Sequence, residues 1–561
     1  MQTFAGVGVS PGRVIGIVRQ MPKPVSEPPT GEFCASATTA EDAAAAVRAA
    51  SKTVHAELKR RADGAHGSAK AVLEATAQMA VDPMLINAAV KLINGGASAE
   101  RAVWDASASV AETLHNLGGY LADRATDVLD VRARLVAALR GVPAPGIPVS
   151  DVPFILVAED LAPADTATLD PAKVVALVTS GGGPQSHTAI IARALGLPAV
   201  VAAAGVDDLA DGTLVYLDGA AGTVSVRPDA AQVAAAEAWA MTAATLAVFN
   251  GNGSTSDGHL VPLLANVGGA KDAVQAAAAG AQGVGLLRTE FCFLGRELEP
   301  SIEDQVAAYR GVFDAFPGKK VVVRTLDAGA DKPVPFLTDA TEPNPALGVR
   351  GYRTDWTSPG VLARQLEAIA AAAEGSEAQV WVMAPMISTA QEAGSFASMC
   401  AAAGLTTPGV MVEVPSAALT SEAILGQVEF ASLGTNDLTQ YTMAADRQLG
   451  PLAGLNSPWQ PAVLMLIGLT VAGSVAEGHH KSVGVCGEAA ADPALAVVLV
   501  GLGVSTLSMT PRALAAVGAV LGSVTLGQAK GLAKLALAAP SATEARARVR
   551  AKLPILDTLG V

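Results

Sequence analysis

The sequence predicts a multidomain α/β protein that ends in a (β/α)8 TIM-like barrel, and three observations lead to this prediction. The chain has 561 residues, which is more than one ordinary domain holds and suggests several. Residues 39–139 are rich in alanine, leucine and charged side chains, a composition typical of helices. Beyond residue 257, eight strand-like runs are each followed by a helical stretch, as expected of a closed barrel.

Changes in composition indicate the domain boundaries. The proline-rich stretch GVPAPGIPVSDVP ends the helical region. From there to residue 226, short β-branched runs alternate with small helices, which predicts a second α/β unit. The turn formers in FNGNGSTSDG mark a further boundary. We expect an α/β domain built from residues 1–38 and 140–228, a helical subdomain inserted at 39–139, a helical linker at 229–256 and a barrel at 257–561.

Composition also excludes several classes of protein. Hydrophobic residues make up 51% of the chain, yet the longest apolar runs are far shorter than the roughly 20 residues of a membrane-spanning helix. The N-terminal segment lacks the basic region and apolar core of an export signal, so we expect a cytoplasmic protein without membrane insertion. Four well-separated cysteines form no CxxC pair, which fits a reducing compartment. A net charge of -14 without a basic block argues against nucleic acid as a partner.

A glycine loop precedes the first candidate reactive residue. The segment VVALVTSGGGPQSHTAIIARALGLP predicts a buried strand, a turn of three glycines, and a helix whose first turn contains His187. Free backbone N–H groups at a helix start stabilise an anion by about 0.3 to 1 kcal/mol, and imidazole is a nucleophile near neutral pH. His187 could therefore carry a phosphoryl group. The same pattern also fits a surface histidine beside a helix cap, and this segment alone leaves both interpretations open.

The ends of the predicted barrel strands supply a second group of candidates. In a (β/α) barrel the active site lies at the C-terminal ends of the strands. Arginine forks bind phosphate and carboxylate, Mg²⁺ prefers one or two carboxylates with substrate oxygens, and a thiol can deliver a proton. Taken singly, each charged residue could simply form an ordinary salt bridge, and the cysteine could be a small buried apolar residue. Together they favour a small polyanionic substrate with a divalent metal. The residues are Arg288, Arg324, Glu413, Asn436, Asp437 and Cys486, with Arg447 on a following loop.

These motifs together resemble Enzyme I of the bacterial phosphotransferase system, the phosphoenolpyruvate–protein phosphotransferase family. The resemblance covers nearly the whole chain, and the order of its barrel motifs is specific to this family and its relatives. It runs from GVGVSPGRVIG through GGGPQSHTAIIARALGLPAVV, GVGLLRTEF, VVVRTLDAGADK, NPALGVRGYR, VMVEVPSAA and SLGTNDLTQYTMAADR to GVCGEAAADP.

The resemblance implies a role for each matching residue. His187 would be the phosphohistidine intermediate of the α/β domain, contacted by Thr166, and Cys486 would protonate the pyruvate enolate. Glu413 and Asp437 would ligate Mg²⁺. Phosphoenolpyruvate would be bound by Arg288, Arg324, Asn436, Asp437 and Arg447, with support from Arg350.

The resemblance also implies an activity and partners. The protein would pass the phosphoryl group of phosphoenolpyruvate through the phosphohistidine to the phosphocarrier protein HPr and release pyruvate, which is the first step of sugar uptake. The helical subdomain would dock HPr near Met79, Leu85 and Arg124, and the barrel would form a homodimer. Two segments depart from the family pattern: GGGPQSHT stands where many members have GGRTSHT, and VLEATAQMAVDPML matches weakly.

The region before the histidine distinguishes this chain from related enzymes that share the histidine and the barrel. Pyruvate phosphate dikinase and phosphoenolpyruvate synthase carry a large nucleotide-binding domain there, whereas this region is mostly helical and lacks a phosphate-cradling glycine motif. A nitrogen-regulatory paralogue would carry an additional sensor domain. A scaffold protein without catalysis would keep the fold, but every reactive residue expected of the enzyme is present.

Overall fold

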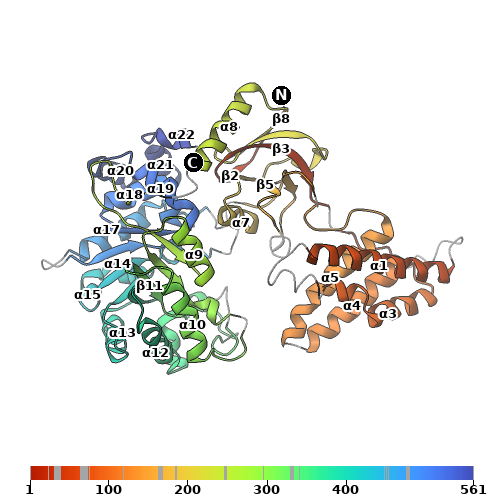
Figure 1. Cartoon of the computed structure of the whole chain (residues 1–561), viewed down its shortest axis with the longest axis horizontal. Coiled ribbons are helices and arrows are strands. Elements are labelled where there is room, and N and C mark those ends of the chain that lie inside the picture. The colour runs from red at the N-terminus through yellow and green to blue at the C-terminus, as the bar shows by residue number, and fades with distance from the viewer. Residues whose placement is uncertain are drawn as a thin grey trace. The chain divides into compact units, whose positions relative to one another are not determined.

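The computed structural model forms two compact units, Met1–Ser10 with Val14–Val233 and Pro11–Arg13 with Ala234–Val561 (Figure 1). The structure describes residues 2–22, 25–30, 39–63, 74, 76–117, 119–148, 150–161, 169–183, 186–245, 249, 251–294, 296–328, 334–339, 341–447, 449, 452, 454–475, 480–559 and 561.

Helices make up the inserted part of the first unit, as the sequence predicts. Asp82 begins the second of them, because its carboxylate accepts the backbone N–H of Met84 at 2.7 Å and Pro83 fits the first helical position. The apolar faces of the helices enclose a core that includes Val47, Leu58 and Leu135. The helices are α1 (Ala40–Asp63), α3 (Pro83–Asn94), α4 (Ala99–Leu117) and α5 (Gly119–Arg140).

The α/β part of the first unit is one eight-stranded sheet with the strand order β1-β8-β7-β3-β4-β5-β6-β2. Strands β3, β4, β5 and β6 run parallel, and antiparallel pairs lie at both edges. The helical insertion separates β3 from β4 in sequence but not in the sheet. The strands are β1 (Thr3–Ala5), β2 (Val7–Ser10), β3 (Arg13–Gln20), β4 (Phe154–Ala158), β5 (Val174–Thr179), β6 (Ala199–Val201), β7 (Leu214–Asp218) and β8 (Thr223–Val226).

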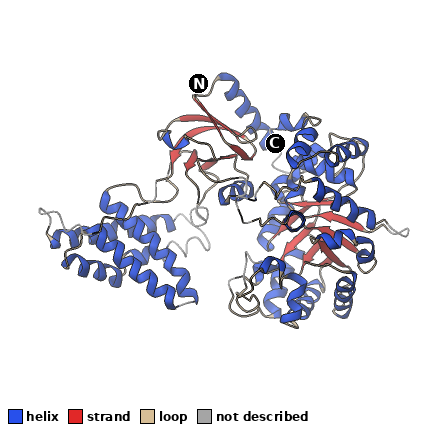
Figure 2. Cartoon of the chain, turned by 180° about the vertical axis from the view of Figure 1, so that it is seen from behind, coloured by secondary structure: helices blue, strands red, loops and turns tan. Residues whose placement is uncertain are grey.

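The second unit is a closed barrel of eight parallel strands, and each strand overlaps one of the eight predicted runs. Figure 2 shows its strands in red, enclosed by helices. The multidomain α/β prediction with a TIM-like barrel is therefore confirmed. The strands are β9 (Leu263–Val267), β10 (Val284–Arg288), β11 (Lys320–Arg324), β12 (Gln379–Ala384), β13 (Pro408–Val412), β14 (Phe430–Leu433), β15 (Ser482–Val485) and β16 (Thr506–Met509).

Helices bury their apolar faces against the outside of the barrel. One core joins the strand residues to helix residues such as Phe313, Phe396 and Leu495. Thr389 and Thr525 each begin a helix with a full capping box. The principal helices are α9 (Ala270–Ala278), α10 (Ile302–Phe313), α12 (Val361–Ala373), α13 (Ala390–Ala402), α14 (Pro415–Leu419), α15 (Ser421–Leu425), α16 (Thr435–Met443), α17 (Pro461–Gly473), α18 (Pro493–Leu502), α19 (Leu514–Leu521), α20 (Leu526–Leu537), α21 (Ala542–Arg550) and α22 (Ile555–Leu559).

Within the described ranges, no single helix is both long and apolar enough to cross a membrane. One pair, Pro511–Leu521 with Leu526–Leu537, reaches the required length and composition only when taken together, and it is bent by 106°.

Candidate active site at the barrel mouth

The C-terminal ends of the barrel strands bring the predicted residues together. Arg288 and Arg324 are the last residues of the neighbouring strands β10 and β11, and the two stand opposite each other in the parallel pairing. Glu413 directly follows β13, and Cys486 directly follows β15. Parallel strands of a barrel all end at the same mouth. Residues that lie up to about two hundred positions apart in the sequence therefore meet there.

Arg324 is buried between two carboxylates. Its guanidinium lies 2.6 Å from Glu290 Oε1 and 3.2 Å from Asp327 Oδ2. Burial by itself would lower the pKa of Arg324, but Glu290 and Asp327 raise it above its usual value. Glu290 Oε2 and Arg324 Nε are buried without a hydrogen-bond partner among the residues that the structure describes. The cation is thus held firmly while one of its N–H groups remains unused.

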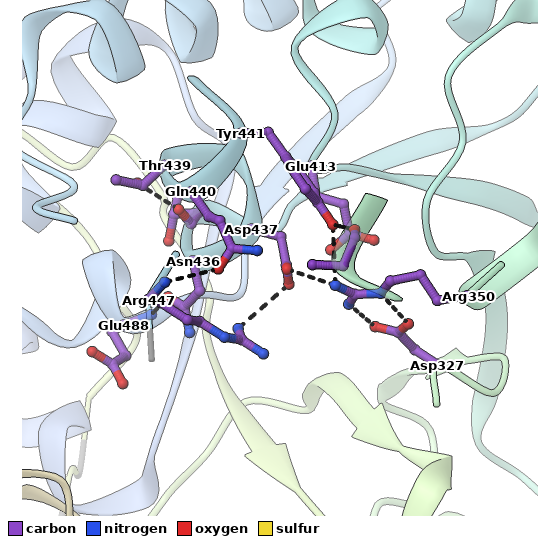
Figure 3. Close-up of polar contacts among 12 residues, drawn as sticks. Asp327, Arg350, Glu413, Asn436, Asp437, Thr439, Gln440, Tyr441, Arg447 and Glu488 are labelled. Carbon is purple, nitrogen blue, oxygen red and sulfur yellow. Dashed lines mark hydrogen bonds and ion pairs between the residues drawn. The ribbon is translucent and has the colours of Figure 1, made fainter. Parts of the chain in front are cut away.

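Arg350 joins two carboxylates across the mouth (Figure 3). It donates to both oxygens of Asp327, at 3.1 and 2.8 Å, and to Asp437 Oδ1 at 2.9 Å. Its Nη1 also contacts the Tyr441 hydroxyl at 3.2 Å, and this hydroxyl donates to the carbonyl of Ala346. Burial would raise the pKa of the Asp327 carboxyl, but the guanidiniums of Arg350 and Arg324 lower it to about 2. Asp327 is therefore ionised at any physiological pH.

The first turn of α16 presents Asn436 and Asp437. Asp437 is shared between two guanidiniums, because its other oxygen lies 3.6 Å from Arg447 Nη1 (Figure 3). The Arg447 loop is fixed in turn by a hydrogen bond from its backbone N–H to Gln440 Oε1 at 3.1 Å. Asn436 accepts the backbone N–H of Glu488 at 3.3 Å, which leaves its NH₂ group available to a substrate oxygen.

Glu413 is the most deeply buried carboxylate of the site, with 1% of its surface exposed. Its Oε1 accepts the backbone N–H of Met386 at 2.7 Å. A side chain on Gly434 would come within 2.7 Å of Glu413 Oε2, so glycine is required for this approach. Burial, followed by the charges of Asp437 and Asp327, raises the pKa of Glu413 to about 8.

The carboxylates of the mouth suit a divalent cation. Glu413 is a buried carboxylate with a raised pKa, and it lies beside two other carboxylates. Its charged form is therefore disfavoured, and a bound cation would stabilise it. Within the described ranges, no group of three or more His, Cys, Asp or Glu side chains is arranged to hold a metal. Glu413 and Asp437 with substrate oxygens match the sparse protein coordination that Mg²⁺ accepts. The donor set therefore fits a hard cation that is shared with a substrate.

Cys486 lies buried in the barrel mouth with its Sγ 3.6 Å from the Leu433 carbonyl. Burial raises its pKa, while the Ser432 hydroxyl and the Arg324 charge act in the opposite direction. The thiol is protonated at neutral pH and can serve as a proton donor. The backbone carbonyl of Cys486 accepts a hydrogen bond from Asn266 Nδ2 at 2.9 Å, and Asn266 Oδ1 accepts one from Ser508 at 2.6 Å.

His187 belongs to the other unit and is the first residue of α7 (His187–Leu195). The Ser186 hydroxyl begins this helix by accepting the backbone N–H of Ala189 at 3.3 Å. Next to His187, the Thr188 hydroxyl donates to Asp160 Oδ1 at 2.7 Å. The predicted strand, glycine turn and helix start are thus present. The side chain of His187 and all of Thr166 lie outside the described residues.

The residues expected to dock a partner protein lie in different environments. Leu85 is 4% exposed and packs into the core of the helical subdomain, so its side chain faces the core rather than solvent. Met79 is partly buried against the same core. Met84, which precedes Leu85 in the sequence, is 63% exposed. The Arg124 side chain lies outside the described residues, although its backbone is part of α5.

Sequence reasoning missed three residues of the mouth, namely Glu290, Asp327 and Tyr441. Glu290 and Asp327 follow Arg288 and Arg324 in sequence by two and three positions, in RTEF and RTLDAG. Charged residues directly after a strand end are the signal that could have identified them. Tyr441 has no such signal, since it lies one helical turn beyond Asp437 and contacts Arg350 only through the tertiary fold.

Three family models match successive parts of the chain. The PEP-utilising enzyme N-terminal model matches residues 5–124, the mobile-domain model residues 151–222, and the PEP-binding-domain model residues 246–525. The last of these covers the barrel strands and the charged mouth. Fold and site therefore define the class of PEP-utilising enzymes.

Curated relatives identify the family within this class. A phosphoenolpyruvate-protein phosphotransferase of Streptomyces coelicolor is 53% identical over 98% of this chain and 99% of its own length. Proteins of the same name from Haloferax volcanii and Bacillus subtilis are 39% and 34% identical; they align over 97% and 91% of this chain and over 98% and 92% of their own lengths. The chain belongs to the phosphoenolpyruvate-protein phosphotransferase family. Members of the PEP-utilising enzymes need a divalent metal.

Proposed function

We propose that this protein transfers the phosphoryl group of phosphoenolpyruvate to His187 and then to the phosphocarrier protein HPr, releasing pyruvate. The observation that carries this proposal is the barrel mouth, where arginines, buried carboxylates and a protonated thiol lie at the ends of the strands. The relatives named phosphoenolpyruvate-protein phosphotransferase support the same reaction. Phosphoryl transfer depends mainly on positioning and charge neutralisation, which this arrangement supplies.

The chain's own residues divide the work of the first half-reaction. Arg288, Arg324 and Arg447 bind the phosphate and carboxylate of the substrate, and the Asn436 amide orients it. Glu413 and Asp437 would hold Mg²⁺, which when bound neutralises phosphate charge in the transition state.

Bond making and breaking involve two further side chains. The P–O bond of phosphoenolpyruvate breaks as the phosphoryl group forms a P–N bond with the His187 imidazole. The enolate that remains takes a proton at its methylene carbon from Cys486 Sγ and becomes pyruvate. The thiol suits this step because burial raises its pKa and keeps it protonated.

His187 must visit two sites, because the carrier protein and the barrel mouth cannot occupy its reactive side together. We propose that residues 1–38 and 140–228 form the moving phosphohistidine domain, that residues 39–139 dock HPr, and that residues 257–561 bind phosphoenolpyruvate. The intervening residues 229–256 would serve as hinge. Shortening the turn-rich part of this linker should lower turnover without abolishing substrate binding.

We also propose that the barrel forms a homodimer in the cytoplasm. Leu419 on α14 and Met465 and Leu469 on α17 are large apolar side chains that are 65%, 53% and 47% exposed. The two helices pack against each other, and exposed apolar residues that cluster mark interaction surfaces. Sedimentation of the wild type and of Leu469→Asp tests the proposal: a wild type that stays monomeric at micromolar concentration contradicts it.

Labelling with phosphoenolpyruvate tests the reaction itself. Purified protein is incubated with ³²P-labelled phosphoenolpyruvate and Mg²⁺, and acid-labile label on the protein is measured. The wild type should be labelled, His187→Ala should not be, and His259→Ala, which removes an exposed histidine elsewhere in the chain, should behave as the wild type. Equal labelling of His187→Ala, or an unlabelled wild type, contradicts the proposal.

A further inference from the structure

A buried hydrogen-bond network lies between two outer helices and the strand ends that carry Arg288 and Arg324. Gln365 of α12 stands at its centre, with 1% of its surface exposed. Its Oε1 accepts the backbone N–H of Leu326 at 2.8 Å. Its Nε2 donates to the Thr289 hydroxyl and to the Tyr309 hydroxyl, both at 3.1 Å. The amide oxygen and both N–H groups of this side chain are therefore paired.

The network connects directly to the strand ends. Thr289 immediately follows Arg288, and its hydroxyl donates to the backbone carbonyl of Arg324 at 2.8 Å. Leu326 lies two residues after Arg324, so Gln365 fixes the chain directly after that arginine. Arg288 and Arg324 already stand opposite each other in the β10–β11 register. The Thr289 hydrogen bond joins the two strands at the point where regular pairing ends.

The far side of the network is anchored in α10. The Tyr309 hydroxyl donates to Gln305 Oε1 at 3.1 Å, and Gln305 Nε2 donates to the Pro300 carbonyl at 3.1 Å. Thr289, Tyr309 and Gln305 are each no more than 2% exposed. Each donor faces an acceptor, so the network has one consistent direction of hydrogen bonds. Such a fully paired buried network fixes one arrangement, whereas apolar packing tolerates small displacements.

Helices α10 and α12 do not need buried polar groups to pack against the barrel. Elsewhere α10 and α12 pack through apolar residues such as Phe313, Leu366 and Ile369. The polar groups occur where the two helices meet the ends of β10 and β11. We propose that Thr289 and Gln365 are positioning residues, which hold Arg288 and Arg324 at the spacing that the phosphoenolpyruvate phosphate requires. This inference rests on the proposed function of the barrel mouth.

The test compares Thr289→Val, which removes the hydroxyl at nearly constant volume, with Thr289→Ser, which keeps it. Thr470→Val is the matched control, because Thr470 is also fully buried and its hydroxyl bonds to Leu466 within α17, away from the arginines. The rate of His187 phosphorylation is measured against phosphoenolpyruvate concentration at saturating Mg²⁺. Unfolding by denaturant is measured for each variant, so that effects on stability are separated from effects on substrate binding.

For Thr289→Val we expect the half-saturating phosphoenolpyruvate concentration to rise about tenfold, the size of effect typical of residues that orient a ligand-binding side chain. The maximal rate should change less, Thr289→Ser should restore the wild-type value, and Thr470→Val should lower stability without shifting half-saturation. Thr289→Val and Thr470→Val with the same half-saturation would overturn the inference.

A second variant covers the case in which Thr289→Val does not fold. Tyr309→Phe removes one hydroxyl of the network at a distance from the arginines, and we expect it to raise half-saturation in the same direction. An unchanged value for folded Tyr309→Phe overturns the inference. If the wild type itself is not labelled by phosphoenolpyruvate, the proposed function fails instead, so the two failures are distinguishable.

Discussion

The two ends of strand β11 each hold a cation, but in opposite ways. Lys320 begins the strand, and its ammonium lies 3.6 Å from the ring centroid of Trp381 and 5.4 Å from that of Phe430. Nothing in the described part of the chain gives Lys320 a carboxylate partner, and burial lowers its pKa to about 8. Arg324 ends the strand between Glu290 and Asp327, which raise its pKa despite burial.

This difference separates the structural end of the barrel from the end that acts on a substrate. Aromatic faces stabilise a cation only weakly, and they do not orient its N–H groups toward a ligand. Carboxylates hold a guanidinium in one orientation and leave further N–H groups free to bind phosphate. At the mouth the arginines come with carboxylates, and one of these, Glu413, lies beside Asp437 and Asp327, whose repulsion a divalent metal can relieve. Changes at the mouth should therefore affect activity and charge balance, and changes at the opposite end should affect stability alone.

The largest expected effect is that of Arg350→Met. This substitution leaves Asp327 and Asp437 buried without their shared cation, so the free energy of unfolding should fall by about 3 to 5 kcal/mol. Denaturant unfolding monitored by circular dichroism measures it. Arg364→Met is the control, since Arg364 pairs with Glu299 at an exposed position and should cost no more than about 1 kcal/mol. If both variants lose the same free energy of unfolding, the ion pairs of the mouth are no more important for stability than those of the surface, which contradicts the prediction.

Asp437→Asn should affect catalysis more than folding. Asparagine still accepts the hydrogen bond from Arg350 but loses the charge that would hold Mg²⁺. We expect the rate of His187 phosphorylation to fall about 10²–10³-fold and the half-saturating Mg²⁺ concentration to rise. Asp304→Asn, which removes one partner of an exposed pair with Arg296, should keep the wild-type rate. A normal Mg²⁺ requirement in Asp437→Asn would exclude this carboxylate as a ligand.

Glu413 should make the stability of the metal-free protein depend on pH. Its pKa of about 8 in the folded chain lies above the usual 4.5, so the folded state binds more protons than the unfolded state between these values. Stability should therefore fall as pH rises from 4.5 to 8, by at most about 1.4 kcal/mol per pH unit. Mg²⁺ should offset the loss and stabilise the protein more at pH 8 than at pH 6. Thermal unfolding with and without EDTA, in the wild type and in Glu413→Gln, checks both points; pH-independent stabilisation by Mg²⁺ contradicts them.

The smallest effect is expected at the opposite end of the barrel. The pKa of Lys320 in the folded chain, about 8, lies below its usual 10.5, so its folded state binds fewer protons between these values and stability rises with pH across that range. The aromatic faces oppose part of this shift. Lys320→Met should raise the free energy of unfolding at pH 7 by about 1 to 2 kcal/mol and leave activity unchanged. The exposed neighbour Lys319 provides the control Lys319→Met, and a loss of activity in Lys320→Met would break the comparison.

Much of the fold could be predicted because its patterns are local. Alternating strand and helix composition predicts all eight barrel strands, and the proline-rich stretch before β4 marks the end of the helical insertion. The barrel geometry then makes strand-end residues such as Arg288, Glu413 and Cys486 neighbours without any knowledge of distances. The domain bounds and the roles of these residues stay predictions, since they depend on motions and ligands.

Partners of the predicted residues were harder to infer. The sequence indicates that Arg324 and Asp437 belong to a site, but not that Arg350 joins Asp327 to Asp437, because Arg350 lies in a loop with no regular spacing from either carboxylate. Leu85 was assigned a docking role through resemblance alone, and its helix face turns it into the core. Pairings of this kind depend on how loops and helices cross, which local sequence patterns do not encode.

The sequence by itself determined the class of fold, the barrel, the glycine turn before His187 and the kinds of side chain at the mouth, because these follow from short-range periodicity and from the common direction of parallel strands. Only the tertiary structure decided which carboxylate balances which arginine, how deeply Glu413 is buried, and that Gln365 links two helices to the substrate-facing strand ends. Burial and charge balance are collective properties, since they depend on every segment that packs around a group.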